Sequence, residues 1–462
     1  MQRAVWTVVI ALTAALAGGA QAAAPSNDEL LERVKKLEDQ AVYVKDLEQE
    51  VQLLKRQLEV KDEAAASKGP QPVIGAGPDG FFLQSADKNF VIKLRGYTQL
   101  DSRFFVGESD DAPTNGTDTF IFRRVRPIVE GTVGGWADFR IMPDFANSQL
   151  VLQDAYTNLR PFGPIAQLQI GKYKAPFGLE RLQSATALTF IERGLPTNLV
   201  PNRDLGFQLW GEVGDGLLTY QLAVMNGVPD GGSADSDNND GKDIIARLFS
   251  RPFVNTTIEP LQGLGVGVAT TWGRETGTPS SYKTSGQQTF FSWASGTQLD
   301  DDRFRISPQA YWYWGPFGLF SEYVFSSTSV RRDLPGTDVF GSPDEESWQL
   351  AASYVITGEN ASYRGVTPRE GFSPAKGTWG AFEVAARYDE LSIADEAFEK
   401  GFANPNVSAK QAQGATLGVN WYMNRWLKFV LNYEHTWFDG GAPNGGDRDG
   451  EDLVSTRFQL NY

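Results

Sequence analysis

The sequence predicts an all-β transmembrane barrel of about sixteen antiparallel strands, preceded by an N-terminal α-helical coiled coil. Two changes of pattern along the chain indicate this fold class. After an N-terminal export signal, apolar residues first recur with a helical period, and from Phe81 onward they alternate with a period of two. No later stretch approaches the roughly 18 to 20 consecutive apolar residues of a membrane helix, so we expect strands to cross the membrane.

Residues 1–22 have the layout of a signal peptide. The cationic Arg3 is followed by an apolar run over residues 4–16 and then by small residues. Ala20 and Ala22 supply the small-x-small pattern of a cleavage site, so we expect cleavage after Ala22. The chain contains no cysteine, which excludes disulfides and thiolate metal sites in the exported protein.

Residues 27–62 are predicted to form a periplasmic coiled coil, and residues 63–80, rich in Ala, Gly and Pro, a linker. Neither Gly nor Pro interrupts the predicted helix. Its seam is spaced by alternating fours and threes with one doubled three, which indicates a stammer, at Leu30, Val34, Leu37, Ala41, Val44, Leu47, Val51, Leu54 and Leu58. The alternative is a single solvated helix. If the coil has a partner, peptidoglycan or another periplasmic component is a candidate.

Residues 81–462 are predicted to form the barrel. From residue 92 to 104, apolar or small residues alternate with charged or polar ones, which gives one lipid-facing and one wet face. Sixteen such segments can be counted, beginning near Phe90, Phe120, Trp136, Leu150, Ile165, Leu205, Leu217, Asp243, Gln262, Arg303, Phe317, Glu346, Gly377, Gly414, Trp426 and Asp452. The last segment alternates up to the terminal aromatic Tyr462, as barrel-assembly signals do.

Connectors between these segments alternate between tight turns and long loops, as in outer-membrane barrels with short periplasmic turns. Two connectors break the rule, a short one near Asn147 and a long one over residues 357–376. They leave an uncertainty of about two strands in the count. The predicted location is the outer membrane of a Gram-negative-type bacterium, with outer-membrane lipid around the barrel.

Composition excludes several classes of function. The net charge of −15 argues against nucleic acid as a partner, because phosphate contacts need a basic surface. With His435 as its one histidine, the chain has no multi-histidine metal centre, and we expect neither a metal nor a cofactor. A barrel enzyme would need His435 beside a serine, so enzymatic function is a minor alternative and no catalytic residue is assigned.

Four segments, in order, resemble the phosphate-selective porins O and P: residues 120–126, 169–181, 190–193 and 417–422. The likeness runs from about Phe81 to Tyr462. The resemblance implies a sixteen-stranded homotrimeric barrel whose third loop, about residues 174–204, folds inward and narrows the pore. It also implies that arginine and lysine side chains carry phosphate or other small anions through that constriction.

On this resemblance, Arg123 and Arg124 match paired arginines beside the constriction, Arg181 takes the place of a central lysine, and Arg193 matches a basic residue of the loop. These four are the predicted anion-binding residues. Secondary pore-lining candidates are Arg126, Lys172 and Arg247. Arginine suits such a site because its planar fork makes bidentate contacts to phosphate oxygens. The alternative is that these arginines pair with Glu130, Glu180 and Glu192 and brace the loop.

Two departures from the family pattern bear on selectivity. Gln153, followed by Asp154, stands where the family has an acidic residue that faces the bound phosphate. On the eighth strand, a ladder of arginines is thinned to Lys242, Asp243, Arg247 and Arg251. The expected function is a passive, anion-preferring diffusion channel, with phosphate or polyphosphate as candidate substrates. A general or differently selective porin and an envelope-tethering barrel are the alternatives.

Overall fold

The computed structural model describes residues 26–67, 71–77, 80–107, 116–237 and 239–462. The expected signal peptide, residues 1–22, lies outside the described residues. The chain divides into two compact units, one ending at Gln71 and the other running from Pro72 to Tyr462.

The first unit contains the helix α2 (Asn27–Ser67), 41 residues long. It passes the expected end at Asp62 because the following residues, Glu63 and three alanines, are strong helix formers. Seam residues such as Leu37 and Leu54 are 64% and 57% exposed in the single chain. Pairing of this seam with another helix stays a prediction. None of the helices in the described ranges is long and apolar enough to cross a membrane.

Part of the segment expected to be a linker is a β-hairpin. It consists of β1 (Val73–Gly77) and β2 (Gly80–Gln84), which pair antiparallel with each other. β2 also pairs with the first barrel strand, from Phe81 opposite Leu94 to Gln84 opposite Val91. The β-forming Val73 and Ile74 outweigh the glycines around them once a strand edge is available for pairing.

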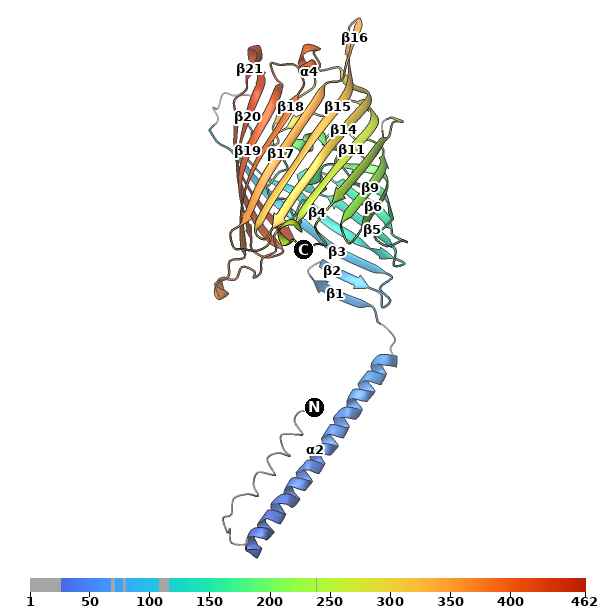
Figure 1. Ribbon diagram of the computed structural model, residues 1–462, viewed down its shortest axis with the longest axis vertical. Helices are drawn as coiled ribbons and strands as arrows, with labels where there is room; N and C mark the ends of the chain where they lie inside the picture. The colour runs from blue at the N-terminus through green and yellow to red at the C-terminus, as the bar shows by residue number, and fades with distance from the viewer. Residues whose placement is uncertain (1–25, 68–70, 78–79, 108–115, 238) are drawn as a thin grey trace. The chain divides into compact units, whose positions relative to one another are not determined.

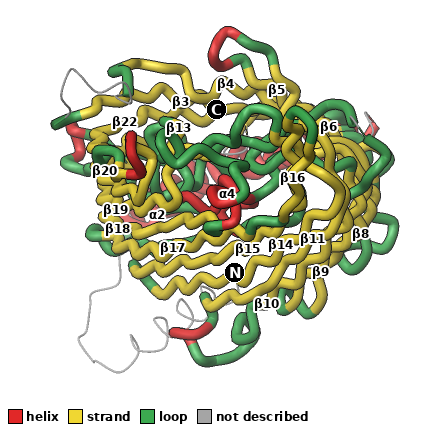
Figure 2. The backbone as a smooth tube through the Cα atoms, turned by 90° about the horizontal axis from the view of Figure 1, so that it is seen from above, coloured by secondary structure: helices red, strands yellow, loops and turns green. Residues whose placement is uncertain are grey.

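The second unit is a closed antiparallel barrel of sixteen strands (Figures 1 and 2). The strands in barrel order are β3 (Val91–Phe105), β4 (Thr119–Val133), β5 (Ala137–Asp144), β6 (Val151–Leu159), β7 (Gln167–Lys174), β8 (Arg203–Val213), β9 (Leu218–Met225), β10 (Asp243–Ser250), β11 (Leu264–Gly277), β14 (Thr297–Trp314), β15 (Phe317–Leu334), β17 (Asp344–Val355), β18 (Ala381–Ile393), β19 (Ala409–Tyr422), β20 (Leu427–Ala442) and β22 (Glu451–Asn461). Pairing of β22 with β3 closes the ring, with Arg457 opposite Asp101.

The predicted strand count is therefore confirmed. Predicted strand starts lie within six residues of the observed ones, and the largest difference is Arg303 against Thr297. The two irregular connectors, residues 145–150 and 356–380, do not change the strand count, and apart from 356–380 the longest connectors lie at one end of the barrel. We call this end the loop end and the opposite one the turn end.

Polar side chains face the lumen and apolar ones face outward. On β19, Thr416 and Asn420 are 1% and 0% exposed, whereas the intervening Leu417 and Val419 are 62% and 43% exposed. Alternation of this kind is the pattern of a barrel whose outer surface contacts lipid. The largest fully buried side chains include charged ones, such as Arg303, Arg305 and Arg457, which fill the lumen.

Short elements complete the connectors. At the loop end they are β12 (Tyr282–Lys283), β13 (Thr289–Phe291), β16 (Thr337–Gly341), α4 (Glu396–Glu399), η2 (Ala146–Ser148), η6 (Pro443–Gly445) and β21 (Gly446–Asp447). At the turn end they are η4 (Glu259–Leu261) and η5 (Pro374–Lys376). Figure 2 looks along the barrel and shows loops lying across the area enclosed by the ring of strands. The interior is therefore narrowed by chain segments and is not an empty cylinder.

Candidate functional site

The connector between β7 and β8, residues 175–202, crosses the lumen and carries α3 (Leu179–Leu182) and η3 (Leu195–Leu199). We call it the third loop. Carboxylates of the barrel wall hold it by its backbone: Glu322 Oε2 accepts from the Leu179 N–H at 2.6 Å, and Asp389 Oδ2 accepts from the Leu195 N–H at 3.1 Å. Other wall side chains donate to its carbonyl oxygens, namely Gln99, Arg387, Asn420, Lys428 and Gln459.

These anchors lie on β3 and on strands from β15 to β22, so the loop packs against that part of the wall. The opposite part of the wall, from β4 to β8, lines the cavity that contains Arg181 and Arg193. A segment of the turn-end connector 356–380 supports the loop from below: Tyr363 Oη donates to the Leu179 carbonyl at 2.6 Å, and the Gln183 amide donates to the Tyr363 carbonyl at 2.8 Å. The loop is therefore braced from the wall and from the turn end.

Two consecutive arginines face the lumen because β4 contains a β-bulge. Gln99 on β3 is opposite Arg124, and the next residue, Leu100, is opposite Phe122, so Arg123 is the extra residue. In a regular strand, neighbouring side chains point to opposite faces, which would send one of the two arginines into lipid. The bulge turns the strand locally, and both guanidinium groups line the same cavity.

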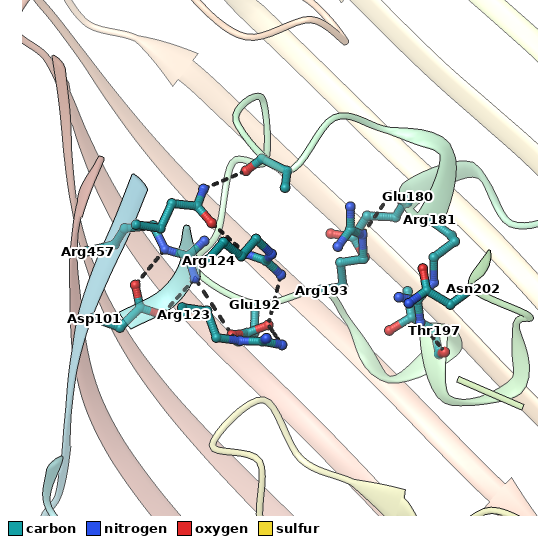
Figure 3. Close-up of polar contacts among 12 residues, drawn as sticks. Asp101, Arg123, Arg124, Glu180, Arg181, Glu192, Arg193, Thr197, Asn202 and Arg457 are labelled. Carbon is teal, nitrogen blue, oxygen red and sulfur yellow. Dashed lines mark hydrogen bonds and ion pairs between the residues drawn. The ribbon is translucent and has the colours of Figure 1, made fainter. Parts of the chain in front are cut away.

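Glu192 of the third loop gathers four arginines from the wall, and three of them, Arg123, Arg124 and Arg457, are labelled in Figure 3. Its carboxylate is 2.5 Å from Arg123 Nε, 3.4 Å from Arg103 Nη2, 3.7 Å from Arg457 Nη2 and 3.8 Å from Arg124 Nη2. Burial by itself would raise the pKa of the Glu192 carboxyl, but the charges of Arg123 and Arg124 outweigh burial and hold that pKa well below its usual range. This carboxylate therefore stays ionised and braces the loop.

The sequence left open that the arginines pair with Glu130, Glu180 and Glu192 and brace the loop. Of these three acidic residues, only Glu192 forms ion pairs with Arg123 and Arg124 among the described residues. Glu130 pairs with Arg95 at 2.6 Å and lies 3.5 Å from Arg140. Glu180 accepts from the Gly194 N–H at 2.9 Å and so stabilises the fold of the loop itself. The paired arginines find their carboxylate partner in Glu192.

Three further cations are held by backbone carbonyl groups. Arg193 donates to two carbonyl oxygens of the third loop at 2.9 Å each, and Arg181 Nη2 donates to the Thr197 carbonyl at 2.8 Å (Figure 3). Lys174 Nζ donates to the Gln183 carbonyl at 2.8 Å. In the part of the chain that the structure describes, no carboxylate lies within ion-pair distance of these three side chains. Carbonyl dipoles fix their geometry without cancelling their charge.

Four cavities adjoin one another from the loop end to the turn end. We call them the loop-end cavity (640 Å³), the basic cavity (200 Å³), the lower cavity (280 Å³) and the turn-end cavity (1260 Å³). The first two share Arg123, Arg124, Arg181, Arg193 and Asn202. The basic and lower cavities share Lys174, Ala185 and Arg203, and the last two share Arg95, Arg140, Ser184 and Thr186. Together they trace a path beside the third loop.

The basic cavity is the smallest of the four and has the strongest imbalance of charge. One carboxylate, that of Asp144, lines it. Seven cationic side chains line it: Arg123, Arg124, Arg126, Lys174, Arg181, Arg193 and Arg203. A cavity of this composition attracts anions, and its low surrounding dielectric strengthens each interaction relative to bulk water.

The structure brings together all four primary predicted residues, Arg123, Arg124, Arg181 and Arg193, at this cavity. It adds Arg126, which pairs with Asp144 at 2.7 Å. The other two secondary candidates do not line any of the four cavities. Lys172 is 2% exposed and forms an ion pair with Asp235, and Arg247 donates to two glutamine side chains and covers the Phe249 ring at 4.7 Å. Their charged groups are engaged in contacts with neighbouring residues, and their role in lining the pore stays a prediction.

Sequence reasoning missed Lys174 and Arg203, which it placed inside the third loop. In the structure they are the last residue of β7 and the first of β8, and they are opposite each other across the strand pair. Arg203 also pairs with Asp154 at 3.0 Å. Continuing the two-residue period from Lys172 would have identified Lys174 as lumen-facing. For Arg203 the strand start was two residues too late.

Comparisons with known proteins agree with this geometry. Residues 92–462 match the family described as phosphate-selective porin O and P. Porin O of Pseudomonas aeruginosa is 25% identical over 420 residues, which cover 82% of this chain and 90% of that protein. Among solved structures, the outer membrane channel DcaP of Acinetobacter baumannii superposes with a TM-score of 0.54 at 12% identity, covering 81% of this chain and 98% of that one.

The structural likeness to DcaP shows a common fold, and the family match covers most of the barrel and the whole third loop. The barrel resides in the outer membrane, and its function is that of a channel and not of an enzyme. The chain belongs to the phosphate-selective porin O and P family.

Proposed function

We propose that this porin is a passive, anion-preferring diffusion channel that admits phosphate and other small anions. The observation that carries the proposal is the lining of the basic cavity, with seven cations and one carboxylate. Arg181, Arg193 and Lys174 are the decisive members, because carbonyl groups hold them and leave their charge unbalanced. A permeating anion can therefore take the position beside these side chains that a carboxylate occupies in an ion pair.

The arrangement also suits rapid release. A small oxyanion entering a narrow pore loses hydration, and fixed donors must replace that water. Several moderate sites in sequence conduct better than one tight site, because an ion must leave as readily as it enters. Arg95 and Arg140 line the next two cavities, but both lie near Glu130, so the positive field weakens toward the turn end.

A reversal potential across a potassium chloride gradient, measured on the full-length protein in planar bilayers, tests this proposal. We expect an anion-signed potential. The competing function is a general or cation-preferring porin, favoured by the net charge of −15. A cation-signed potential would establish that alternative and overturn ours, with the barrel unaffected.

We further propose that the porin is a homotrimer and that α2 contributes to its assembly. The exposed seam of α2 supports this, because a coil tied to each barrel raises the local concentration of its partners. Light scattering in detergent should give the mass of three chains, and a monomer would contradict the assignment.

A coil of this length can also contact peptidoglycan. Co-sedimentation of the full-length protein with isolated peptidoglycan tests that role.

A further inference from the structure

One side chain that lines the basic cavity, that of Gln153, has a buried polar atom without a hydrogen-bond partner among the described residues. This atom is the amide oxygen Oε1. Among the described residues, neither end of its amide forms a hydrogen bond with another side chain or with the backbone. Buried polar atoms are nearly always paired, so this amide takes its partner from the pore itself, from water or from a permeating solute.

A β-bulge in the backbone turns the side chain of Gln153 toward this cavity. On β5 and β6, Met142 is opposite Asp154 and Pro143 is opposite Leu152, so Gln153 is the extra residue of a second β-bulge. The bulge turns Gln153 toward the lumen beside Asp154, its chain neighbour. Asp154 is already committed, since it pairs with Arg203 at 3.0 Å. Gln153 is the uncommitted member of the two.

The chemistry of the side chain at this position decides which oxyanions fit. Near pH 7 hydrogen phosphate has both oxygen acceptors and an O–H donor, whereas sulfate has acceptors alone. A carboxylate at this position can only accept, so it favours an anion with a proton to donate and repels one without. An amide can accept through Oε1 and donate through Nε2, and it carries no charge. It therefore suits both kinds of anion.

We infer that the basic cavity takes tetrahedral oxyanions whether or not they carry a proton, so that sulfate binds as well as phosphate, and that Gln153 is the residue responsible. This inference rests on the proposed anion preference and narrows it to a substrate class. The cationic side chains supply attraction for any anion. Gln153 removes the discrimination against sulfate that an acidic residue would impose.

The test measures block of chloride current by added phosphate or sulfate, in bilayers containing the full-length protein at pH 7. For the natural sequence we expect half-inhibiting concentrations of the two anions within about threefold of each other. In Gln153→Glu, the half-inhibiting concentration of sulfate should rise by more than about tenfold. That of phosphate should rise less, because phosphate can donate a hydrogen bond to the new carboxylate. The ratio between the two anions is the decisive quantity.

Gln169→Glu is the matched control, because Gln169 lines the lower cavity and the substitution adds the same charge deeper in the pore. This variant should weaken the block by phosphate and the block by sulfate to the same extent. Gln153→Ala, which adds no charge and is tolerated more readily, should also leave the ratio near that of the natural sequence while weakening both. Folding of each variant is checked by the heat-dependent gel mobility of the barrel.

Three results would overturn the inference. A natural protein that prefers phosphate over sulfate by tenfold or more, a Gln153→Glu ratio equal to that of Gln169→Glu, or no block by either anion each contradicts it. In these cases an anion-signed reversal potential would leave the proposed function intact. A cation-signed reversal potential would instead remove the proposed function together with the inference.

Discussion

Two groups of cations line the same cavity and differ in how their charge is balanced. Arg123 and Arg124 share the Glu192 carboxylate, which also approaches two other arginines. Arg181 and Arg193 are held by carbonyl oxygens of the third loop. A guanidinium whose donors point at a carboxylate mainly fixes the loop, whereas one held by neutral groups can still attract a passing anion. Position at a constriction therefore does not by itself make an arginine selective.

The largest effect is expected from removing the carbonyl-held pair. Arg181→Ala with Arg193→Ala should lower the permeability ratio of chloride to potassium by about tenfold, since an energy change near 1.4 kcal/mol is enough and each charge is only partly screened. Reversal potentials measure this ratio. Lys283→Ala is the control, because Lys283 is exposed in the wide loop-end cavity. An equal effect of the control would mean that selectivity is set at the vestibule.

A smaller shift, about threefold, is expected for Arg123→Ala with Arg124→Ala. Burial raises the pKa of Glu192, and without these two charges burial is opposed mainly by Arg457, so the pKa rises above its ordinary range and proton uptake by that carboxylate offsets part of the change. The same reversal-potential measurement applies, repeated at pH 8, where less proton uptake should make the shift larger. If this pair mattered more than Arg181 and Arg193, the distinction between the two groups would be wrong.

Glu192→Gln should act in the opposite direction and raise the anion preference by about twofold, because four arginines lose a counter-charge.

The pKa of Glu192 is lowered in the folded protein, so its stabilising effect is fully present above its unfolded value of about 4.3 and is lost only as the pH falls through the lowered value. Thermal unfolding of the natural protein should show no Glu192-dependent change from pH 8 to 5. A variant that unfolds at the same temperature as the natural protein would contradict the bracing role.

The smallest effect is expected at the brace from the turn end. Tyr363→Phe removes the donor to the Leu179 carbonyl, which costs roughly 1 kcal/mol and loosens α3, the helix that contains Arg181. Single-channel records should show more noise in the open state and an unchanged reversal potential. Tyr433→Phe is the control, because Tyr433 faces outward and its hydroxyl contacts Asp452, away from the loop. Equal noise in both variants would argue against a specific brace.

Much of the fold follows from the sequence alone. Period-two alternation is a local property: each lipid-facing side chain must be apolar whatever its neighbours on other strands are, so the strands and their number could be read from residues such as Ile92 to Phe104. The helix at α2 is equally local, because its residues favour helix and no Gly or Pro interrupts them. The sequence also indicated which loop contains Arg181 and Arg193.

Only the tertiary structure decided which charges are free to act. The bulges at Arg123 and Gln153 depend on the register between neighbouring strands, and alternation within one strand cannot show an extra residue. The assignment of Glu192, and not Glu130, to the paired arginines depends on where the third loop crosses the lumen. That path is set by hydrogen bonds from strands far away in the chain. Charge balance is a property of three-dimensional neighbours. The sequence named five of the seven cations of the basic cavity, and only the folded barrel separated those that brace the loop from those that remain unbalanced.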